Sequence, residues 1–152
     1  MRVTTLLRCW MYTLALSGAL VLPMMAAQAQ NADAIKARKA NYDLLNDQMK
    51  AIKAVIDKGG SPADAAAPAK IAQQAALKIP TMFPADSQTG DTKALPNVWS
   101  DPEGFKKLAD AAGAQSAKLV AATGGTDLAA LQTEFTAMGK TCGACHQVNR
   151  AK

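Results

Sequence analysis

The side chains best suited to chemistry lie close together in Cys142-Gly143-Ala144-Cys145-His146. Two thiols three residues apart share one face of a helix, and each can add to one vinyl group of a porphyrin. The imidazole of His146 projects from the same face toward a metal at the ring centre. This spacing predicts one covalently attached haem c per chain, with Cys142 and Cys145 as thioethers and His146 as an iron ligand.

Other uses of these residues fit the sequence less well. A disulfide between Cys142 and Cys145 would be strained within a helix, and a thioredoxin-like pair requires a βαβ context that is absent here. A zinc site needs a fourth ligand, but the chain has one histidine and its third cysteine, Cys9, lies in the N-terminal segment. Three cysteines and one histidine leave little material for a catalytic centre, so we expect a protein that is not an enzyme.

The N-terminal segment has the layout of a secretory signal peptide. Two arginines flank its start, an apolar run extends from Cys9 to Met25, and Ala27-Gln28-Ala29 fits a signal peptidase site. The apolar run is near the lower limit for a membrane span. We therefore expect cleavage of residues 1–29, with residues 30–152 forming a haem domain in the periplasm without membrane attachment.

The charge of the predicted mature chain is modest. Cleavage would remove two of the 17 basic residues and none of the 12 acidic ones, which leaves a formal charge of +3. The basic side chains are interspersed with acidic ones, whereas nucleic-acid binding normally requires a clustered basic face. The sequence therefore predicts no nucleic-acid partner.

The first half of the mature chain predicts two helices. Apolar positions spaced alternately by three and four predict a helix from Asp33 to about Lys58, ended by Gly59-Gly60. Ser61-Pro62 begins the next helix with a capping residue and a proline in the first turn. Pro68 either kinks this second helix or marks the start of its regular part. Its buried face should carry Ile71, Ala75 and Ile79.

The second half predicts two more helices after a long connection. Residues 80–97 contain three prolines, and Ser100 and Glu103 have the spacing of a capping box for a third helix. A last helix from about Thr126 to Arg150 follows Gly124-Gly125. One face of it carries Leu128, Leu131, Phe135, Met138, Cys142 and Cys145. The pattern predicts an all-α fold, a left-handed up-down antiparallel four-helix bundle with a long loop between helices 2 and 3.

The chain resembles cytochrome c′ and its class II relatives over essentially the whole predicted mature sequence. The resemblance rests on Ile35-Lys36-Ala37-Arg38, Lys58-Gly59 with Pro62, Pro96-Asn97-Val98-Trp99-Ser100-Asp101, and Cys142 to Arg150. It implies that a first-helix arginine contacts a haem propionate and that a side chain one turn further on covers the vacant face of the iron. In this sequence those residues would be Arg38 and Tyr42.

Arg38 and Tyr42 also interrupt the apolar face of the first helix, where such residues need a reason. A buried arginine needs an anion. Tyr42 brings a ring that could close a pocket and a hydroxyl that could bond solvent or a propionate. An ungapped register would instead give these roles to Lys39 and Asp43, but a carboxylate above a haem is chemically poor. We also expect Phe135 and Met138 to contact the haem and Arg150 to lie near its proximal side.

The resemblance implies binding of nitric oxide and carbon monoxide, single-electron transfer with an unknown redox partner, and a homodimer formed by the first two helices. Because Met138 shares the helix of His146 and no second histidine exists, we expect a five-coordinate, high-spin iron. The alternative is a six-coordinate, low-spin electron carrier with Met49 or Met82 as the sixth ligand. A third interpretation is an exported helical binding module without haem.

Overall fold

The computed structural model describes the backbone of residues 21–152 and the side chains of residues 31–152. The predicted signal peptide therefore lies largely outside the described residues, and its cleavage stays a prediction. The long helices are α1 (Val21–Asp57), α2 (Ala66–Lys78), α4 (Pro102–Ala122) and α5 (Leu128–Asn149). A short helix, α3 (Asn97–Ser100), and 3-10 turns at Pro62–Ala65 and Ile79–Thr81 complete the secondary structure of this part of the chain.

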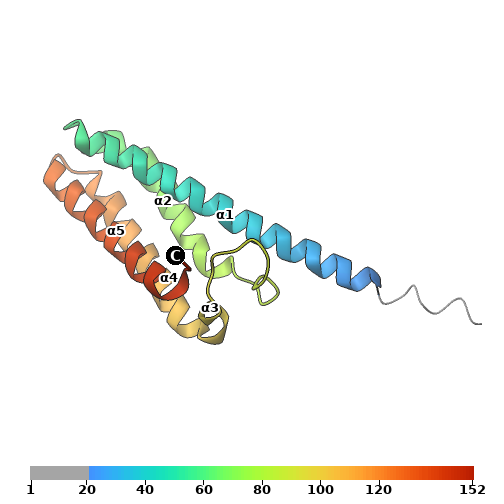
Figure 1. The fold of residues 1–152 in the computed structure, drawn as a ribbon. Coiled ribbons are helices and arrows are strands. Elements are labelled where there is room, and N and C mark those ends of the chain that lie inside the picture. Colours follow the sequence, from blue (N-terminus) through green and yellow to red (C-terminus); the bar gives the residue numbers. More distant parts are fainter. Residues whose placement is uncertain (1–20) are drawn as a thin grey trace, which may run out of the picture.

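The long helices form an antiparallel bundle of two pairs, α1 beside α2 and α4 beside α5 (Figure 1). The α2 helix also packs against α4, so it joins the two pairs. The contact between α1 and α5 is much smaller than these three contacts. The predicted all-α four-helix bundle is confirmed, and so is the long connection between its second and third long helices.

The turn after α1 follows from its two glycines. Gly60 N–H donates to Val55 O at 2.9 Å and Gly59 N–H donates to Ile56 O at 3.0 Å, the pair of bonds that defines a Schellman motif. Gly59 has φ +63°, a left-handed conformation that favours glycine. The helix therefore ends where the sequence predicted, and the chain reverses direction within a few residues.

The start of α2 confirms one prediction and corrects another. Ser61 caps the segment, since its Oγ accepts from Ala63 N–H at 3.3 Å and its own N–H donates to Asp64 at 3.2 Å. Pro68 is the third residue of α2, where its missing N–H removes no bond of the helix. Ile71, predicted to be buried, is 38% exposed. The other two residues predicted for this face, Ala75 and Ile79, are buried, together with Ala69, Ala72 and Ala76.

This correction has a simple geometric cause. Because α2 packs against both α1 and α4, it needs small side chains on the surfaces that meet its neighbours. Ile71 precedes the buried Ala72 by one position, which turns its side chain about 100° away from that alanine around the helix.

The start of α4 lies one residue later than the predicted capping box. Asp101 is the N-cap, and its Oδ1 accepts from Gly104 N–H at 3.0 Å. Ser100 belongs to α3, so the Ser100–Glu103 box is wrong. Pro102 occupies the first turn of α4, where its fixed φ suits a helix start, and the residue before it supplies the cap.

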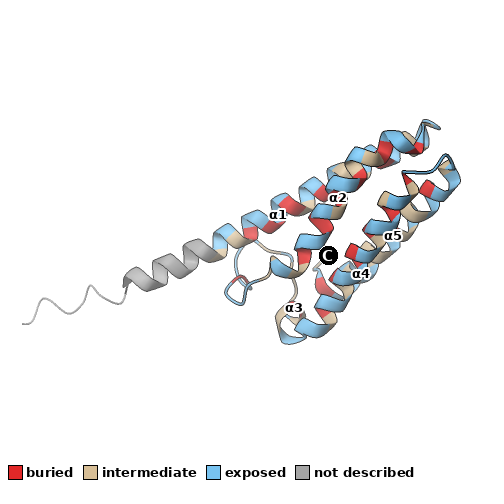
Figure 2. Cartoon of the chain, turned by 180° about the vertical axis from the view of Figure 1, so that it is seen from behind, coloured by how far each residue is buried: buried red, intermediate tan, exposed pale blue. Residues whose placement is uncertain are grey.

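Two clusters of buried side chains form the core. Figure 2 marks the buried residues along the helices. The first contains residues of all four long helices, including Ile52, Leu119, Leu131 and Met138. The second contains residues of α1, α2, α4 and the segment between α2 and α4: Leu45, Ala72, Ala75, Ile79, Val98, Phe105 and Ala109. No residue of α5 belongs to the second cluster. The C-terminal half of α5 therefore lies beside this part of the bundle without being built into its core.

Candidate functional site

The predicted haem-binding thiols lie on the C-terminal half of α5. Cys142 and Cys145 are half-buried and free. Burial raises the pKa of both thiols, and the neighbouring Cys145 raises the pKa of Cys142 further. Cys142 packs against the first core cluster, whereas Cys145 Sγ accepts a hydrogen bond from Asn149 Nδ2 at 3.5 Å. Both sulfurs are thus available for thioether bonds.

His146 follows on the same helix and is exposed. Partial desolvation and the positive charge of Arg150 lower its pKa, which favours the neutral imidazole needed for a bond to iron. Arg150 is also exposed and forms the C-cap of α5, with its N–H donating to His146 O at 3.2 Å. Across the described part of the chain, no three His, Cys, Asp or Glu side chains converge on a common metal position.

Tyr42 lies on α1, within range of the charge that these thiols can carry. Its side chain is half-buried and packs against the second core cluster. Burial raises the pKa of the phenol well above its ordinary value, and the charges that Cys145 and Cys142 can carry raise it further, whereas Arg38 opposes the shift. The phenol is therefore neutral, and it lies close enough to both thiols to feel their charge.

Arg38 is 3% exposed and makes three hydrogen bonds to uncharged oxygens. Nη1 donates to Ser87 Oγ at 2.8 Å, and Nη2 donates to Ser87 O at 3.0 Å and to Thr92 Oγ1 at 2.6 Å. The guanidinium also lies 4.9 Å from the ring centre of Phe83 and 5.7 Å from that of Trp99. None of the ion pairs found among residues 31–152 includes Arg38. Its burial lowers its pKa, and it is a buried cation without an acidic partner.

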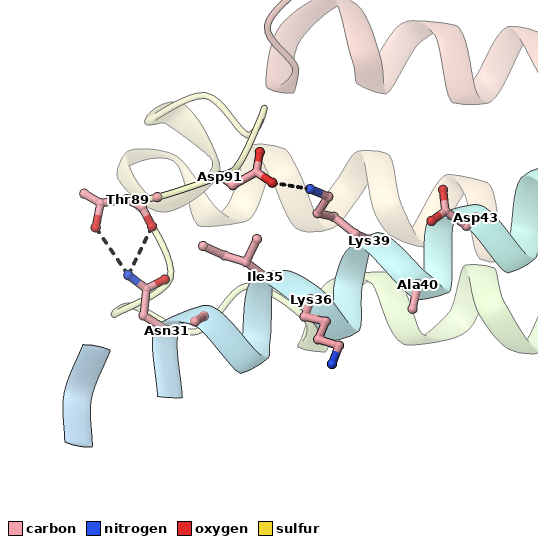
Figure 3. A pocket seen from close by; sticks show the side chains of 10 residues that line it. Asn31, Ile35, Lys36, Lys39, Ala40, Asp43, Thr89 and Asp91 are labelled. Carbon is pink, nitrogen blue, oxygen red and sulfur yellow. Dashed lines mark hydrogen bonds and ion pairs between the residues drawn. The ribbon is translucent and has the colours of Figure 1, made fainter. Parts of the chain in front are cut away.

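The two residues of the alternative register on α1, Lys39 and Asp43, lie on the side of the helix that faces away from the core. Lys39 is exposed and pairs with Asp91 at 2.6 Å, and Asp43 is exposed. Both line a surface hollow between α1 and the loop, together with Asn31, Ile35, Lys36 and Thr89 (Figure 3). Gly90, with φ +110°, lets the loop lie against Ile35 here, since a Cβ would approach Ile35 Cδ1 to 3.3 Å. The hollow contains none of the predicted haem-binding residues.

The remaining predicted contacts and ligands lie in different surroundings. Met138 is fully buried and Phe135 is half-buried in the first core cluster, one and two turns before Cys142. Met49 packs against both clusters from α1. Met82 lines a separate surface pocket with α1 residues such as Ala34. Neither Met49 nor Met82, the two candidate sixth ligands, therefore has a sulfur that is left unpacked beside the thiols.

Several site residues were missed at the level of sequence. Ser87 and Thr92 hold Arg38, and Asn149 contacts Cys145. These residues lie in the irregular loop or at the end of a helix, where no periodic pattern distinguishes a bonding side chain from a solvated one. Asn97 and its bonding partner Asn149 both lie within stretches on which the resemblance rests, and those stretches were their only signal.

These surroundings fit a flat, anionic ring. The C-terminal half of α5 carries both thiols and His146, and it contributes no residue to the second core cluster. A neutral aromatic side chain, Tyr42 on α1, lies within range of the charge of both thiols. The unpaired charge of Arg38 could be compensated by a propionate. When bound, haem supplies an iron that changes oxidation state and binds ligands, while Cys142, Cys145 and His146 would hold it.

Bundle and motif together define the class of helical proteins with covalently attached haem c. The sequence profile of the family described as Cytochrome C' matches residues 33–150. Two curated proteins of Cereibacter sphaeroides named cytochrome c-554 are 38% and 42% identical to this chain over 51% of its length. The chain spans 52% and 60% of the length of these two relatives.

Other relatives match nearly from end to end. Cytochrome c′ of Rhodopseudomonas palustris is 36% identical over 90% of this chain and 94% of its own. A solved nitric oxide complex of a mutant of cytochrome c′ from Alcaligenes xylosoxidans is 27% identical, with a TM-score of 0.73 over 80% of this chain and 97% of that one. The chain therefore belongs to the cytochrome c′ family, and its cofactor is haem c.

Proposed function

We propose that this chain is a periplasmic haem c protein whose five-coordinate, high-spin iron binds nitric oxide and carbon monoxide and transfers single electrons. The observation that carries the proposal is the neutral, half-buried phenol of Tyr42 on α1, which lies within range of the charge of Cys142 and Cys145 on α5. A side chain of this kind covers the vacant side of the ring without donating a strong ligand to iron. Its role is binding and electron transfer, and no catalytic residues are proposed.

Few side chains of this chain could serve as a sixth iron ligand, which supports a vacant sixth position. The sequence contains one histidine, so a second imidazole is not available. Met49 packs into the apolar core, and a methionine in such a place usually serves as a filler. Met82 lies with Ala34 and Ala37 in a surface pocket that contains neither Tyr42 nor a thiol. A low-spin carrier with a methionine ligand would require one of these side chains to leave its surroundings.

The distal environment supports small neutral ligands. A pocket closed by an aromatic ring and lined by apolar core disfavours anions and water, which need several hydrogen bonds. Because burial raises the pKa of Tyr42, its phenol stays protonated and offers at most one donor. A relative in the family is described as a nitric oxide complex, which supports the same ligand for this chain.

The visible spectrum of the reduced protein tests the coordination state. We expect a high-spin spectrum that changes on addition of carbon monoxide. A low-spin spectrum that ignores carbon monoxide would contradict the proposal and favour the methionine-ligated carrier.

Two substitutions test the position of the vacant site. Tyr42→Met would offer a thioether at the proposed distal face and should convert the iron to a six-coordinate, low-spin form. Asp43→Met is the matched control, because Asp43 is the next residue on α1 and faces the surface hollow (Figure 3). A low-spin spectrum in the control, or an unchanged high-spin spectrum in Tyr42→Met, would refute the assignment of Tyr42.

Periplasmic location rests on the N-terminal segment. We propose cleavage after Ala29, within the Ala-x-Ala pattern that follows the apolar run. Within residues 21–152, no helix has both the length and the apolar character needed to cross a membrane. Cell fractionation with a haem stain should find the protein in the periplasmic fraction.

The surface of the first two long helices supports the proposed homodimer. Leu44 on α1 is 42% exposed and Ile71 on α2 is 38% exposed. These two helices pack against each other through the small alanines of α2, so both exposed side chains belong to one pair of helices. We propose that a second copy covers this surface. Sedimentation should give a dimer that Leu44→Glu dissociates, whereas Leu77→Glu, at an exposed leucine beside Gly113 of α4, should leave it intact.

A further inference from the structure

Two segments that lie far apart in the sequence form one surface at the end of α5. An antiparallel bridge between Ala94 and Arg150 brings residues 92–100 and 141–152 together. Two main-chain hydrogen bonds, of 2.9 Å and 2.8 Å, flank this bridge. The second segment also contains all three predicted haem-binding residues, so the joined surface adjoins the site.

The joined segments carry the whole formal charge of the predicted mature chain. Lys93, Arg150 and Lys152 are exposed, and the two segments contain no acidic residue. The rest of the predicted mature chain has 12 basic and 12 acidic side chains, whose formal charges cancel. None of the three cations takes part in the ion pairs found among the described side chains. The positive charge is therefore local and uncompensated.

The acidic residues that flank the first segment along the chain have other partners. Asp91 pairs with Lys39 at 2.6 Å. Asp101 caps α4, with its Oδ1 accepting from Gly104 N–H at 3.0 Å. Neither carboxylate pairs with one of the three cations, which keep their charge for a partner.

An exposed apolar side chain belongs to the same surface. Val148, two positions before Arg150, is 53% exposed. Asn97 Nδ2 donates to Val148 O at 2.9 Å, which holds the end of α5 beside the neighbouring Pro96, also exposed. A small apolar centre with a polar, charged rim is the usual composition of a protein–protein interface.

We propose that this basic surface, formed by Lys93, Val148, Arg150 and Lys152, docks an acidic electron-transfer protein. The proposal rests on the proposed function, because it names the chemical class of the redox partner. One electron passes between the partner's redox group and the iron, so one is oxidised and the other reduced, and no atom is transferred. Opposite charges steer the encounter. Three cations beside a valine suit an acidic protein, whereas a nucleic acid requires a longer basic face.

The test is reduction of the oxidised, haem-loaded protein by a flavodoxin, a small acidic protein whose fully reduced flavin gives single electrons. Stopped-flow absorbance measures the second-order rate constant of haem reduction at increasing ionic strength. The rate constant should fall roughly 10-fold or more between about 10 mM and 1 M salt, because the Debye length shrinks from about 30 Å to about 3 Å.

A pair of double variants tests where the charge acts. Lys93→Glu with Lys152→Glu should lower the rate constant at low salt roughly 10-fold or more. Arg150 stays in place, because its charge also acts on the predicted iron ligand. The matched control, Lys70→Glu with Lys118→Glu, changes the net charge equally near the start of α2 and the end of α4, where the chain turns at the other end of the bundle (Figure 1). It should lower the rate constant less than about 3-fold.

At about 1 M salt all three proteins should react equally fast, because the charges are then screened. Equal rate constants of the wild type and the Lys93 and Lys152 variant at low salt would overturn the proposal, and so would an equal loss in the control. A difference that persists at high salt would also overturn it, because it would reflect an altered iron potential and not docking.

Reduction by dithionite separates this proposal from the proposed function. A wild type that dithionite reduces but flavodoxin does not would refute the docking surface and leave single-electron transfer standing. A wild type that neither reagent reduces would contradict the proposed electron transfer, and the docking surface with it.

Discussion

Ser87 should contribute to stability out of proportion to its size. It is fully buried, and its Oγ accepts from Arg38 Nη1 at 2.8 Å and donates to Pro84 O at 2.8 Å. Ser87→Ala removes the hydroxyl that Nη1 contacts. The oxygen of Pro84 keeps two other donors, Ser87 N–H and Trp99 Nε1, both at 3.0 Å. The main loss is therefore at the buried guanidinium.

A buried donor left without its partner costs about 1–3 kcal/mol. For a chain of this length, such a loss of unfolding free energy lowers the melting temperature by roughly 3–10 °C. The measurement is thermal and urea unfolding of the haem-loaded protein, followed by circular dichroism.

Ser116→Ala provides the matched control. Ser116 is also fully buried, but its Oγ donates only to Gly113 O within α4. Alanine is the better helix former at such a position, so we expect a change below about 1 kcal/mol. Equal destabilisation by the two substitutions would refute the reasoning, because it would mean that Ser87 matters as a buried hydroxyl and not as a partner of Arg38.

Three further predictions follow from other parts of the molecule. Tyr42 is the only tyrosine in residues 30–152, so a phenol titration reports it alone, and its pKa should exceed 10. Because the unfolded chain releases the phenol proton more readily, the unfolding free energy should fall as pH rises past about 10, and Tyr42→Phe should remove this effect. Asp101→Ala should cost about 0.5–2 kcal/mol of unfolding free energy in urea, because it removes the cap on Gly104 N–H, whereas Ser100→Ala should cost little. A larger loss in Ser100→Ala than in Asp101→Ala would mean that Ser100 is the cap after all. The intact mass of the exported protein should equal residues 30–152 plus one haem, and a mass without haem would contradict the cofactor assignment.

The sequence was most informative where a local rule has few alternatives. The end of α1 at Gly59-Gly60 and the cap at Ser61 follow from backbone conformation and hydrogen bonding within a few residues. The Cys142, Cys145 and His146 spacing is of the same kind, since one helix presents all three residues. The sequence failed where two local patterns compete, as in the choice of Asp101 over Ser100, and where burial depends on a neighbour, as at Ile71.

The register of α1 shows the limit of periodicity. Arg38 and Lys39 are adjacent, and both lie near the edge of the apolar face of the helix, so periodicity alone does not say which of them is buried. The fold distinguishes them, because the loop brings Ser87 and Thr92 to Arg38, and Asp91 to Lys39. These contacts join residues about 50 positions apart, and no pattern within α1 contains them.

By itself, the sequence determined the cofactor, the helices and the order in which they are connected, because attachment spacing, helix periodicity and turn chemistry act over fewer than ten residues. Only the tertiary structure decided what surrounds the site. It brought Tyr42 near the thiols, buried Arg38 without an acid, and oriented Asn149 through Asn97. Such contacts depend on the relative placement of helices and loop, which is fixed by packing of the whole bundle and not by any one segment.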